Sequence, residues 1–406
     1  MKRIMGLLCF AFVFLLVFSM ILEAESSNEK LVSDANITVD NNDELKRAIA
    51  QAKAGIKVLI APGVYQGGLY FENLKGTPDK PIVISAADSA KPPIIQGGNE
   101  GFHFSDSAYI ELHNIIISNV MYNGIGVDDG GTFDTPAHHI LLKGLLIRDV
   151  GPDGNKDGIK LSGVDDFRVE DCIIERWGSG GSAIDMVGCH RGTILKCTFK
   201  YNDQVQGNGV QTKGGSSDLI IRECRFEHSG SRSVNIGGST GLKYFRPGVQ
   251  GYEAKNITVE RCTFIGSQAP IAFVGVDGAL VKYNTIYQPK KWVIRILQET
   301  QDSGFTPCRN GIFTDNIITF RSDEVAIVVN IGQYTAPETF SFARNFWYCL
   351  DNADRSKPDL PTPEIDAIYG KNPLFRDAES GNFNLMPNSP AQKMGVYAPR
   401  DYKESK

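Results

Sequence analysis

The sequence lacks three features that would point to common classes of partner. It has no basic stripe and a formal net charge of −5, so nucleic acid is not expected to bind. It has no C-x-x-C motif and no histidine pair at metal-ligand spacing, so a zinc site is not expected. No apolar run beyond the N-terminus is long enough to cross a membrane. The composition, with 42% hydrophobic residues, is otherwise that of a folded globular chain.

One long apolar run lies at the N-terminus of the 406-residue chain. Lys2 and Arg3 precede apolar residues 4–21, and Ala24 completes a small-residue cleavage motif. We interpret residues 1–24 as a secretory signal peptide, with a membrane anchor as the alternative. The mature chain, residues 25–406, is then expected to be a monomer that is secreted, periplasmic or at the cell surface, with no membrane insertion.

Four short segments share one pattern, in which apolar and polar residues alternate and a glycine follows. They are residues 157–163, 183–188, 208–214 and 233–238. This pattern is typical of a short half-buried strand that ends in a turn. A second apolar segment follows each of the first three, at residues 169–174, 194–199 and 220–226. A unit that recurs every 20 to 50 residues or so indicates a solenoid.

A second series of residues marks one corner of each repeat. Its members are Asn114, Gly144, Cys172, Cys197, Cys224, Cys262, Asn284, Asn316 and Asn345. The interchange of cysteine and asparagine predicts small side chains stacked inward, coil upon coil, with the cysteines as buried packing residues. Removal of Cys9 with the signal leaves an odd set of seven cysteines, which does not suggest a disulfide framework.

These repeats predict an all-β fold, because the coils are too short for long helices and rich in β-branched residues. We predict a single-stranded, right-handed parallel β-helix, with regular coils over about 55–350 and an irregular tail over 351–406. Leu45, Ile49 and Ala52 lie on one helical face behind the capping residues 41–44. This predicts a short helix that covers the N-terminal end of the solenoid.

The chain resembles the pectate-lyase-like superfamily of right-handed parallel β-helix proteins. The motifs that carry the resemblance are the segments at 61–65 and 76–82, the asparagine and cysteine ladder, and the segments at 372–375 and 384–391. Many members of that superfamily act on acidic polysaccharides. The resemblance therefore implies a polysaccharide lyase with a uronate-containing substrate.

Residues 209–214 are similar to a motif of the chondroitinase B and alginate lyase family. In that family a lysine after a strand is the base, and an arginine one coil later assists it. Lys213 matches the lysine, but Gly237 stands where the arginine is expected. Gln206 and Asn208 replace the acidic calcium ligands of the family. The resemblance implies elimination with Lys213 as base, and identical chemistry does not follow from it.

Strand alternation places polar side chains on the outer surface beside Lys213. If the apolar residues point inward, one outward column contains Lys160, Asp185, Gln211 and Asn235. Stacked coils are about 4.8 Å apart. Lys160, Asp185 and Lys213 are therefore predicted to be neighbours in a functional patch, with an ordinary solvated face as the alternative.

β-Elimination of a uronate polymer needs a group that neutralises the sugar carboxylate, a base for the C5 proton and an acid for the departing O4. We predict catalytic roles for Lys213, Lys160 and Asp185, with Lys160 supplying a like charge that favours a neutral Lys213. Predicted substrate ligands are Gln211, Asn235, Arg232, Tyr244, Arg246 and His190. Calcium is an alternative carboxylate clamp, with Asp128 and Asp157 as candidate ligands.

Other functions remain open at this stage. A β-helix glycoside hydrolase needs two carboxylates, but Asp185 has no predicted carboxylate neighbour in the adjacent coils, and Asp128 is the nearest candidate. A C5 epimerase shares the proton-abstraction step. A non-catalytic carbohydrate-binding surface protein is favoured by the absence of the arginine and of the acidic calcium ligands.

Overall fold

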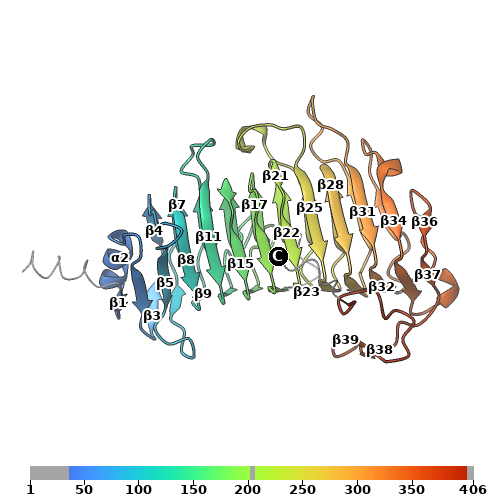
Figure 1. The fold of residues 1–406 in the computed structure, drawn as a ribbon, viewed down its shortest axis with the longest axis horizontal. Coiled ribbons are helices and arrows are strands. Elements are labelled where there is room, and N and C mark those ends of the chain that lie inside the picture. The colour runs from blue at the N-terminus through green and yellow to red at the C-terminus, as the bar shows by residue number, and fades with distance from the viewer. Residues whose placement is uncertain (1–35, 202–205, 400–406) are drawn as a thin grey trace, which may run out of the picture.

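The computed structural model describes residues 36–201 and 206–399, which form one elongated stack of coils (Figure 1). The predicted signal peptide, residues 1–24, lies outside the described residues. Within the described part, no helix is both long and apolar enough to span a membrane. Three parallel sheets run the length of the stack, and each coil contributes strands to them in turn.

The strands of the described residues fall into three long sheets, here named A, B and C. Sheet A has 15 strands: β1 (Asn36–Val39), β2 (Lys57–Ile60), β5 (Ile82–Ala86), β8 (Ala108–His113), β11 (Ala137–Lys143), β14 (Val164–Asp165), β15 (Arg168–Glu170), β18 (Thr193–Leu195), β21 (Ser216–Ser217), β22 (Ile220–Arg222), β25 (Ala254–Glu260), β28 (Val276–Lys282), β31 (Arg309–Thr314), β34 (Ser341–Ala343) and β36 (Glu364–Ile365). Sheet B has 12: β3 (Val64–Gln66), β6 (Ile94–Gln96), β9 (Ile116–Ser118), β12 (Leu146–Arg148), β16 (Ile173–Glu175), β19 (Thr198–Lys200), β23 (Arg225–Glu227), β26 (Thr263–Ile265), β29 (Thr285–Tyr287), β32 (Ile317–Phe320), β35 (Phe346–Cys349) and β37 (Ile368–Tyr369). Sheet C has 10: β4 (Leu69–Glu72), β7 (Phe102–Ser105), β10 (Ile125–Asp128), β13 (Ile159–Ser162), β17 (Ser182–Val187), β20 (Asn208–Lys213), β24 (Arg232–Gly237), β27 (Ala269–Val274), β30 (Ile294–Leu297) and β33 (Val329–Ile331).

Coils stack in register because like side chains repeat at the inward positions. In sheet C, Ile159 pairs with Ile184, which pairs with Val210 in the next coil. These residues are fully buried. In sheet B, the rings of Phe199, Phe226 and Phe264 follow one another with successive centroids 4.8 Å apart. The apolar alternation seen in the sequence is thus the core of an all-β parallel helix, as predicted.

The corner between sheets A and B confirms the buried ladder and corrects part of it. Cys172 and the other six described cysteines are buried free thiols. Asn114 and Gly144, however, adopt left-handed backbone angles with φ of 54° and 64° and form the bend itself. Ile115 and Leu145 occupy the buried position that cysteine takes in later coils. The prediction for Asn114 and Gly144 was therefore wrong by one residue.

The asparagines of the later coils form a hydrogen-bonded chain along this corner. Asn284 Nδ2 donates to Asn316 Oδ1 at 2.9 Å, and Asn316 Nδ2 donates to Asn345 Oδ1 at 3.0 Å. Asn345 Nδ2 then donates to Glu364 Oε1 at 2.7 Å. Each asparagine oxygen also accepts a backbone N–H of the preceding coil. The asparagine side chains therefore provide hydrogen-bond partners for buried backbone groups at this corner. In the coils that carry cysteine at this position, those backbone groups have other partners.

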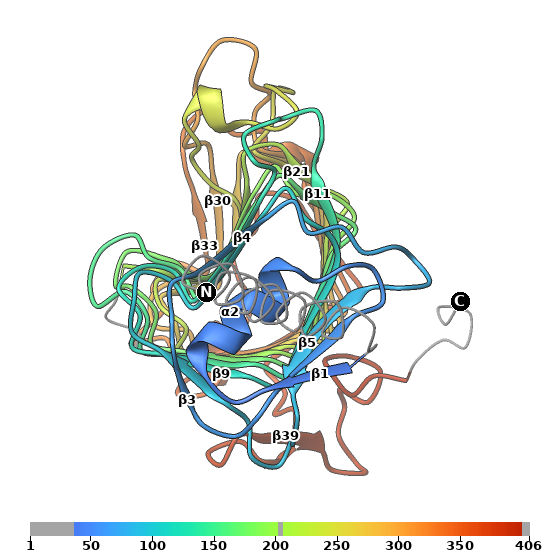
Figure 2. The same ribbon diagram turned by 90° about the vertical axis from the view of Figure 1, so that its left-hand side faces the viewer.

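A short helix covers the N-terminal end, as predicted. Helix α2 (Asn42–Ala50) begins after Asn41, whose side chain accepts the N–H of Glu44 at 3.0 Å. Leu45 and Ile49 are fully buried against the first coils. The C-terminal tail returns along the outside of the stack, where the antiparallel pair β38 (Phe375–Asp377) and β39 (Asn382–Leu385) packs beside β29 outside the three sheets (Figures 1 and 2).

Three long loops leave the stack at the corner where sheet C strands lead into sheet A. They follow β10, β24 and β30 and comprise residues 129–136, 238–253 and 298–308; we call them the corner loops. The second contains the 3-10 helix η1 (Leu242–Tyr244). They project together from one edge of the triangular cross-section (Figure 2). Loops of different lengths therefore lie beside one face of sheet C, whose own strands stack regularly.

Candidate functional site

The outer face of sheet C carries the predicted polar column. Lys160, Asp185, Gln211 and Asn235 are register partners on β13, β17, β20 and β24. Lys213 lies two positions along from Gln211 and pairs with Val187. The register follows from strand alternation alone, because inward pairing of the apolar residues fixes which neighbours point outward.

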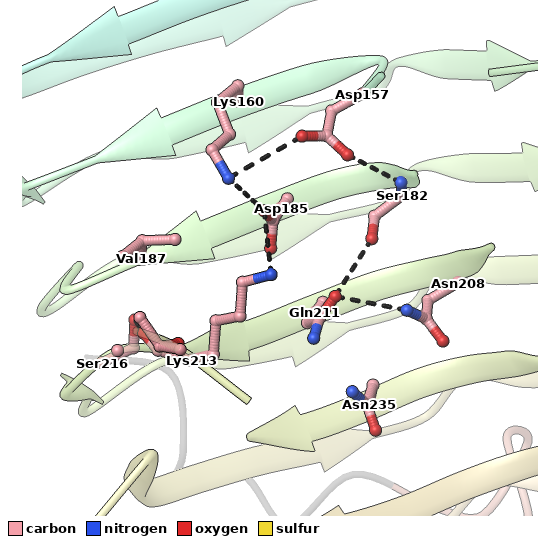
Figure 3. Close-up of polar contacts among 12 residues, drawn as sticks. Asp157, Lys160, Ser182, Asp185, Val187, Asn208, Gln211, Lys213, Ser216 and Asn235 are labelled. Carbon is pink, nitrogen blue, oxygen red and sulfur yellow. Dashed lines mark hydrogen bonds and ion pairs between the residues drawn. The ribbon is translucent and has the colours of Figure 1, made fainter. Parts of the chain in front are cut away.

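Asp185 is the centre of this column, and two lysines converge on it. Lys160 donates to Asp185 Oδ2 from the preceding coil, and Lys213 Nζ lies 3.3 Å from the same oxygen from the following coil (Figure 3). The Asp185 side chain is only 1% exposed, whereas those of Lys160 and Lys213 are 27% and 15% exposed. Its other oxygen, Oδ1, has no hydrogen-bond partner among the described residues. The carboxylate is thus covered by the two ammonium groups.

A second carboxylate, Asp157, joins the cluster from the loop before β13. Its Oδ2 lies 3.8 Å from Lys160 Nζ, and its Oδ1 accepts the backbone N–H of Ser182 at 2.7 Å (Figure 3). Burial and the charge of Asp185 raise the pKa of Asp157 to about 7. The expectation that Asp185 has no carboxylate neighbour in an adjacent coil was therefore wrong. Alternation missed Asp157 because this residue precedes the strand.

The charges of the cluster are set by its carboxylates. Burial would raise the pKa of Asp185, but Lys160 and Lys213 outweigh burial and hold this pKa below its usual value. Burial would likewise lower the pKa of Lys160, yet Asp185 and Asp157 raise it. Lys160 and Asp185 are consequently an ammonium and a carboxylate at neutral pH, while Asp157 is close to half protonated.

The lysines open into a cavity of about 670 Å³ between sheet C and two corner loops. Both lysines contribute to its wall, and Asp185 does not. The rest of the wall comes from β4, β7, β10, β13, β17 and the corner loops and includes Tyr70, Glu72, Ser105, Asp128, Asp129, Ser162, Val187, Thr240, Tyr244 and Arg246. A cavity of this size accommodates a sugar-sized ligand in contact with the lysines.

The fold of the chain can now be compared with known proteins. Residues 100–246 match the family model described as the right-handed β-helix region. The fold is a right-handed parallel β-helix. A search of curated proteins finds no match to this sequence.

Several solved β-helix structures are similar to this chain. A rhamnogalacturonan lyase superposes with a TM-score of 0.57 at 11% identity, covering 88% of this chain and 94% of that one. A pectate lyase gives 0.50 at 13% identity, covering 88% and 87%. An alginate lyase from Paenibacillus sp. str. FPU-7 gives 0.48 at 16% identity, covering 74% and 99%. At these identities the likeness establishes the β-helix fold, which the sequence motifs predicted, and says nothing of the reaction.

Arg246 and Arg232, the two arginines predicted to bind substrate, instead form hydrogen bonds with other residues of this β-helix. Arg246 Nε donates to Asp129 Oδ2 at 2.5 Å, and its second terminal nitrogen to Asp129 Oδ1 at 3.3 Å. Both side chains are buried, and this pair ties the second corner loop to the first. Arg232 donates to Asn235 Oδ1 at 3.0 Å and to Glu299 at 2.7 Å. The two arginines therefore hold the corner loops and sheet C in place.

Of the remaining predicted substrate ligands, Tyr244 lines the cavity, whereas Gln211 and His190 do not. Tyr244 is exposed and lines the cavity. Gln211 Oε1 accepts hydrogen bonds from Ser182 Oγ at 3.3 Å and from Asn208 Nδ2 at 3.2 Å, both within sheet C. His190 lies at the sheet A edge, with Nδ1 2.7 Å from Asp165 Oδ1, and does not line the cavity. His190 therefore lies outside this cavity, and its substrate contact stays a prediction.

The two candidate calcium ligands are held apart by the register. Asp128 pairs with Ser162 at the far end of β10, whereas Asp157 precedes β13 and donates its backbone N–H to Asn123. Asp128 binds His103 Nε2 at 2.7 Å and Ser105 Oγ at 2.7 Å. Among residues 36–201 and 206–399, no group of three or more His, Cys, Asp or Glu side chains is placed to hold a metal ion.

His103 is a site residue that the sequence did not indicate. Its Nδ1 lies 2.6 Å from Glu100 Oε2, and its Nε2 faces Asp128. Burial works against the imidazolium, but hydrogen bonds to Asp128 and Glu100 raise the pKa of His103 to about 9. The signal that could have found it is its place in the outward column, since His103 pairs with Gly126, which pairs with Lys160.

Proposed function

We propose that this β-helix is a secreted enzyme that cleaves a uronate-containing polysaccharide by β-elimination. The observation that carries the proposal is the convergence of Lys160 and Lys213 on the buried Asp185 at the wall of a sugar-sized cavity. When Asp157 is protonated and Lys213 carries its proton, two ammonium groups face one carboxylate, and the cluster meets the substrate with a net positive charge; Lys213 gives up this proton before it acts as base. Such a surface favours a sugar carboxylate and stabilises the enolate-like charge that develops on it.

In this proposal each residue has a separate task. Lys160, held as an ammonium, neutralises the uronate carboxylate and makes the C5 proton acidic. Lys213, as the free amine, takes the C5 proton; the C5–H electron pair forms the C4–C5 double bond, and the C4–O4 bond breaks. Tyr244 lines the same cavity and donates its phenolic proton to the departing O4. Asp185 positions both lysines.

A glycoside hydrolase is the second candidate, and one observation favours it. Asp157 and Asp185 are neighbouring carboxyl groups whose pKa values are shifted in opposite directions, one raised to about 7 and the other lowered. Opposite shifts are typical of an acid and a base that act together. The lyase is the better fit, because both carboxyl groups are buried and the lysines stand between Asp185 and the cavity.

The test is to incubate residues 25–406 with a panel of uronate polymers and to follow the ultraviolet absorbance of the unsaturated product alongside new reducing ends. We expect absorbance and reducing ends to rise together, and Lys213→Ala to abolish both. Lys200→Ala is the matched control, since Lys200 is an exposed lysine on sheet B paired with Glu227. Reducing ends without absorbance would establish hydrolysis. Binding without either product would make the protein a carbohydrate-binding module, and exchange of the C5 proton without cleavage would identify an epimerase.

A further inference from the structure

The cavity at the lysines continues toward the N-terminal coils. A second cavity of about 320 Å³ is lined by Tyr70, Tyr122, Glu100 and His103, together with Gly68, Leu69 and Asn99. Tyr70 lines both cavities, so they adjoin on one face of sheet C. None of these residues has a role in the proposed elimination.

The two cavities lie along one outward column of sheet C. Tyr70 pairs with His103, His103 with Gly126, and Gly126 with Lys160, on β4, β7, β10 and β13. A Cβ at Gly126 would lie 2.6 Å from His103 Nδ1 and 2.9 Å from Glu100 Oε2. Glycine therefore leaves the face open between the His103 cluster and the lysines. Two coils, about 10 Å, separate the centres of the two parts.

The two parts differ in charge. Lys160 and Lys213 face the first cavity, whereas Glu72, Glu100 and Asp128 surround its N-terminal end and the second cavity. The three carboxylates outnumber the two cations that His103 and Lys156 supply there. A polymer lying along the column thus meets positive charge over β13 to β20 and negative charge over β4 to β10. A second carboxylate of the polymer would be repelled there.

The second cavity instead offers aromatic surface. Tyr70 and Tyr122 are 54% and 47% exposed, and both line this cavity. Lys156 Nζ lies 3.9 Å above the Tyr122 ring and fixes one side of it. Exposed tyrosine rings bind the apolar faces of sugar rings and leave their hydroxyl groups to polar neighbours. Here Glu100 and His103 are those neighbours.

We infer that the substrate alternates, with a uronate over Lys160 and Lys213 and a sugar without an acidic group over Tyr70 and Tyr122. The inference rests on the proposed function for the position of the uronate. It adds that a polymer made of uronate alone is a poor ligand, because its next carboxylate lies over Glu100 and Asp128.

The test compares two probes by calorimetry: polygalacturonate, which is uronate throughout, and unsulfated chondroitin, in which uronate alternates with an N-acetylhexosamine. Lys213→Arg protein, which keeps the positive charge at this position, is used where turnover would interfere. We expect chondroitin to bind at least tenfold more tightly. Tyr122→Ala should weaken chondroitin binding about tenfold, Tyr122→Phe should restore it, and Tyr334→Ala, at a more exposed tyrosine that lines neither cavity, should change nothing. Glu72→Gln should improve polygalacturonate binding.

The outcomes separate the two proposals. Equal binding of both probes, binding of neither, or no effect of Tyr122→Ala would overturn the alternating substrate. If the tyrosine effects appear but Lys160→Ala leaves chondroitin binding unchanged, the aromatic subsite stands and the uronate position, and with it the proposed function, fails.

Discussion

Lys213 Nζ lies 3.3 Å from Asp185 Oδ2 across two adjacent coils, and that oxygen also accepts from Lys160. A single buried carboxylate therefore fixes the spacing of two cations. This arrangement has a cost, since burial of the Asp185 charge is offset only by the charge of the lysines. A bound uronate, itself an anion, would compete with Asp185 for these cations.

Asp185→Asn should destabilise the protein and change the titration of its neighbour. Removing one partner of a buried ion pair costs about 3 to 5 kcal/mol. Because the Asp185 charge is one cause of the raised Asp157 pKa, we expect that pKa to fall below about 7 in the variant. Carboxyl ¹³C NMR titration measures the shift, and chemical denaturation measures the loss of stability. An unchanged Asp157 titration would contradict the described cluster.

Asp157 should make stability decrease with pH. Its pKa is about 7 in the folded protein and near 3.9 for an unfolded aspartate, so the folded state binds the extra proton between these values. This contribution to stability is complete below about pH 4 and is lost as the pH rises to about 7. In Asp157→Asn it is absent. The free energy of unfolding of the variant relative to wild type should therefore rise over this range, by up to about 1.4 kcal/mol per pH unit. A flat difference would show that Asp157 is not perturbed.

Elimination should accelerate with pH in the alkaline range if Lys213 is the base. The reactive form is the neutral amine, and lysine ordinarily titrates near 10.4. We expect kcat/KM to rise with pH above neutrality and Lys213→Arg to be inactive, because arginine keeps its proton. Stopped assays across pH 6 to 10 or so measure the profile. Arg variant activity near that of wild type would remove Lys213 from the role of base.

The pair between Arg246 and Asp129 should hold the cavity wall. Arg246→Ala leaves Asp129 buried without its cation, and we expect a loss of about 3 to 5 kcal/mol together with a raised KM. Asp129→Ala added to it should cost much less than the sum of the single changes. A double-mutant cycle by thermal unfolding measures the coupling. Strict additivity would mean that the pair does not stabilise the corner loops.

Much of the fold follows from the sequence because a strand has a period of two. Once Ile159 and Ile184 are placed inward, Lys160 and Asp185 must face outward beside each other. The capping helix follows from its apolar face for the same kind of reason. The error at Asn114 arose because asparagine suits both a buried ladder and a left-handed bend, and only the register distinguishes them.

The rest of the site depends on contacts between residues that the strand repeat does not relate to one another. Arg246 reaches Asp129 across 117 residues, between two loops that have no repeat. Asp157 enters the cluster from outside its strand, and His190 leaves it because the turn after β17 carries it to the sheet A edge. Side chains on loops are placed by the packing of other loops, and no local pattern records that packing.

The asparagine chain along the A–B corner gives the molecule a direction. Every amide in it donates one N–H to the side chain that follows in the series, so each coil presents a hydrogen-bond donor to the coil stacked after it. Glu364 ends the series by accepting from Asn345, Trp347 and Tyr369 at once. A parallel stack is otherwise an open template on which further strands can assemble. Glu364 accepts the last amide N–H of the series and so limits the length of the stack.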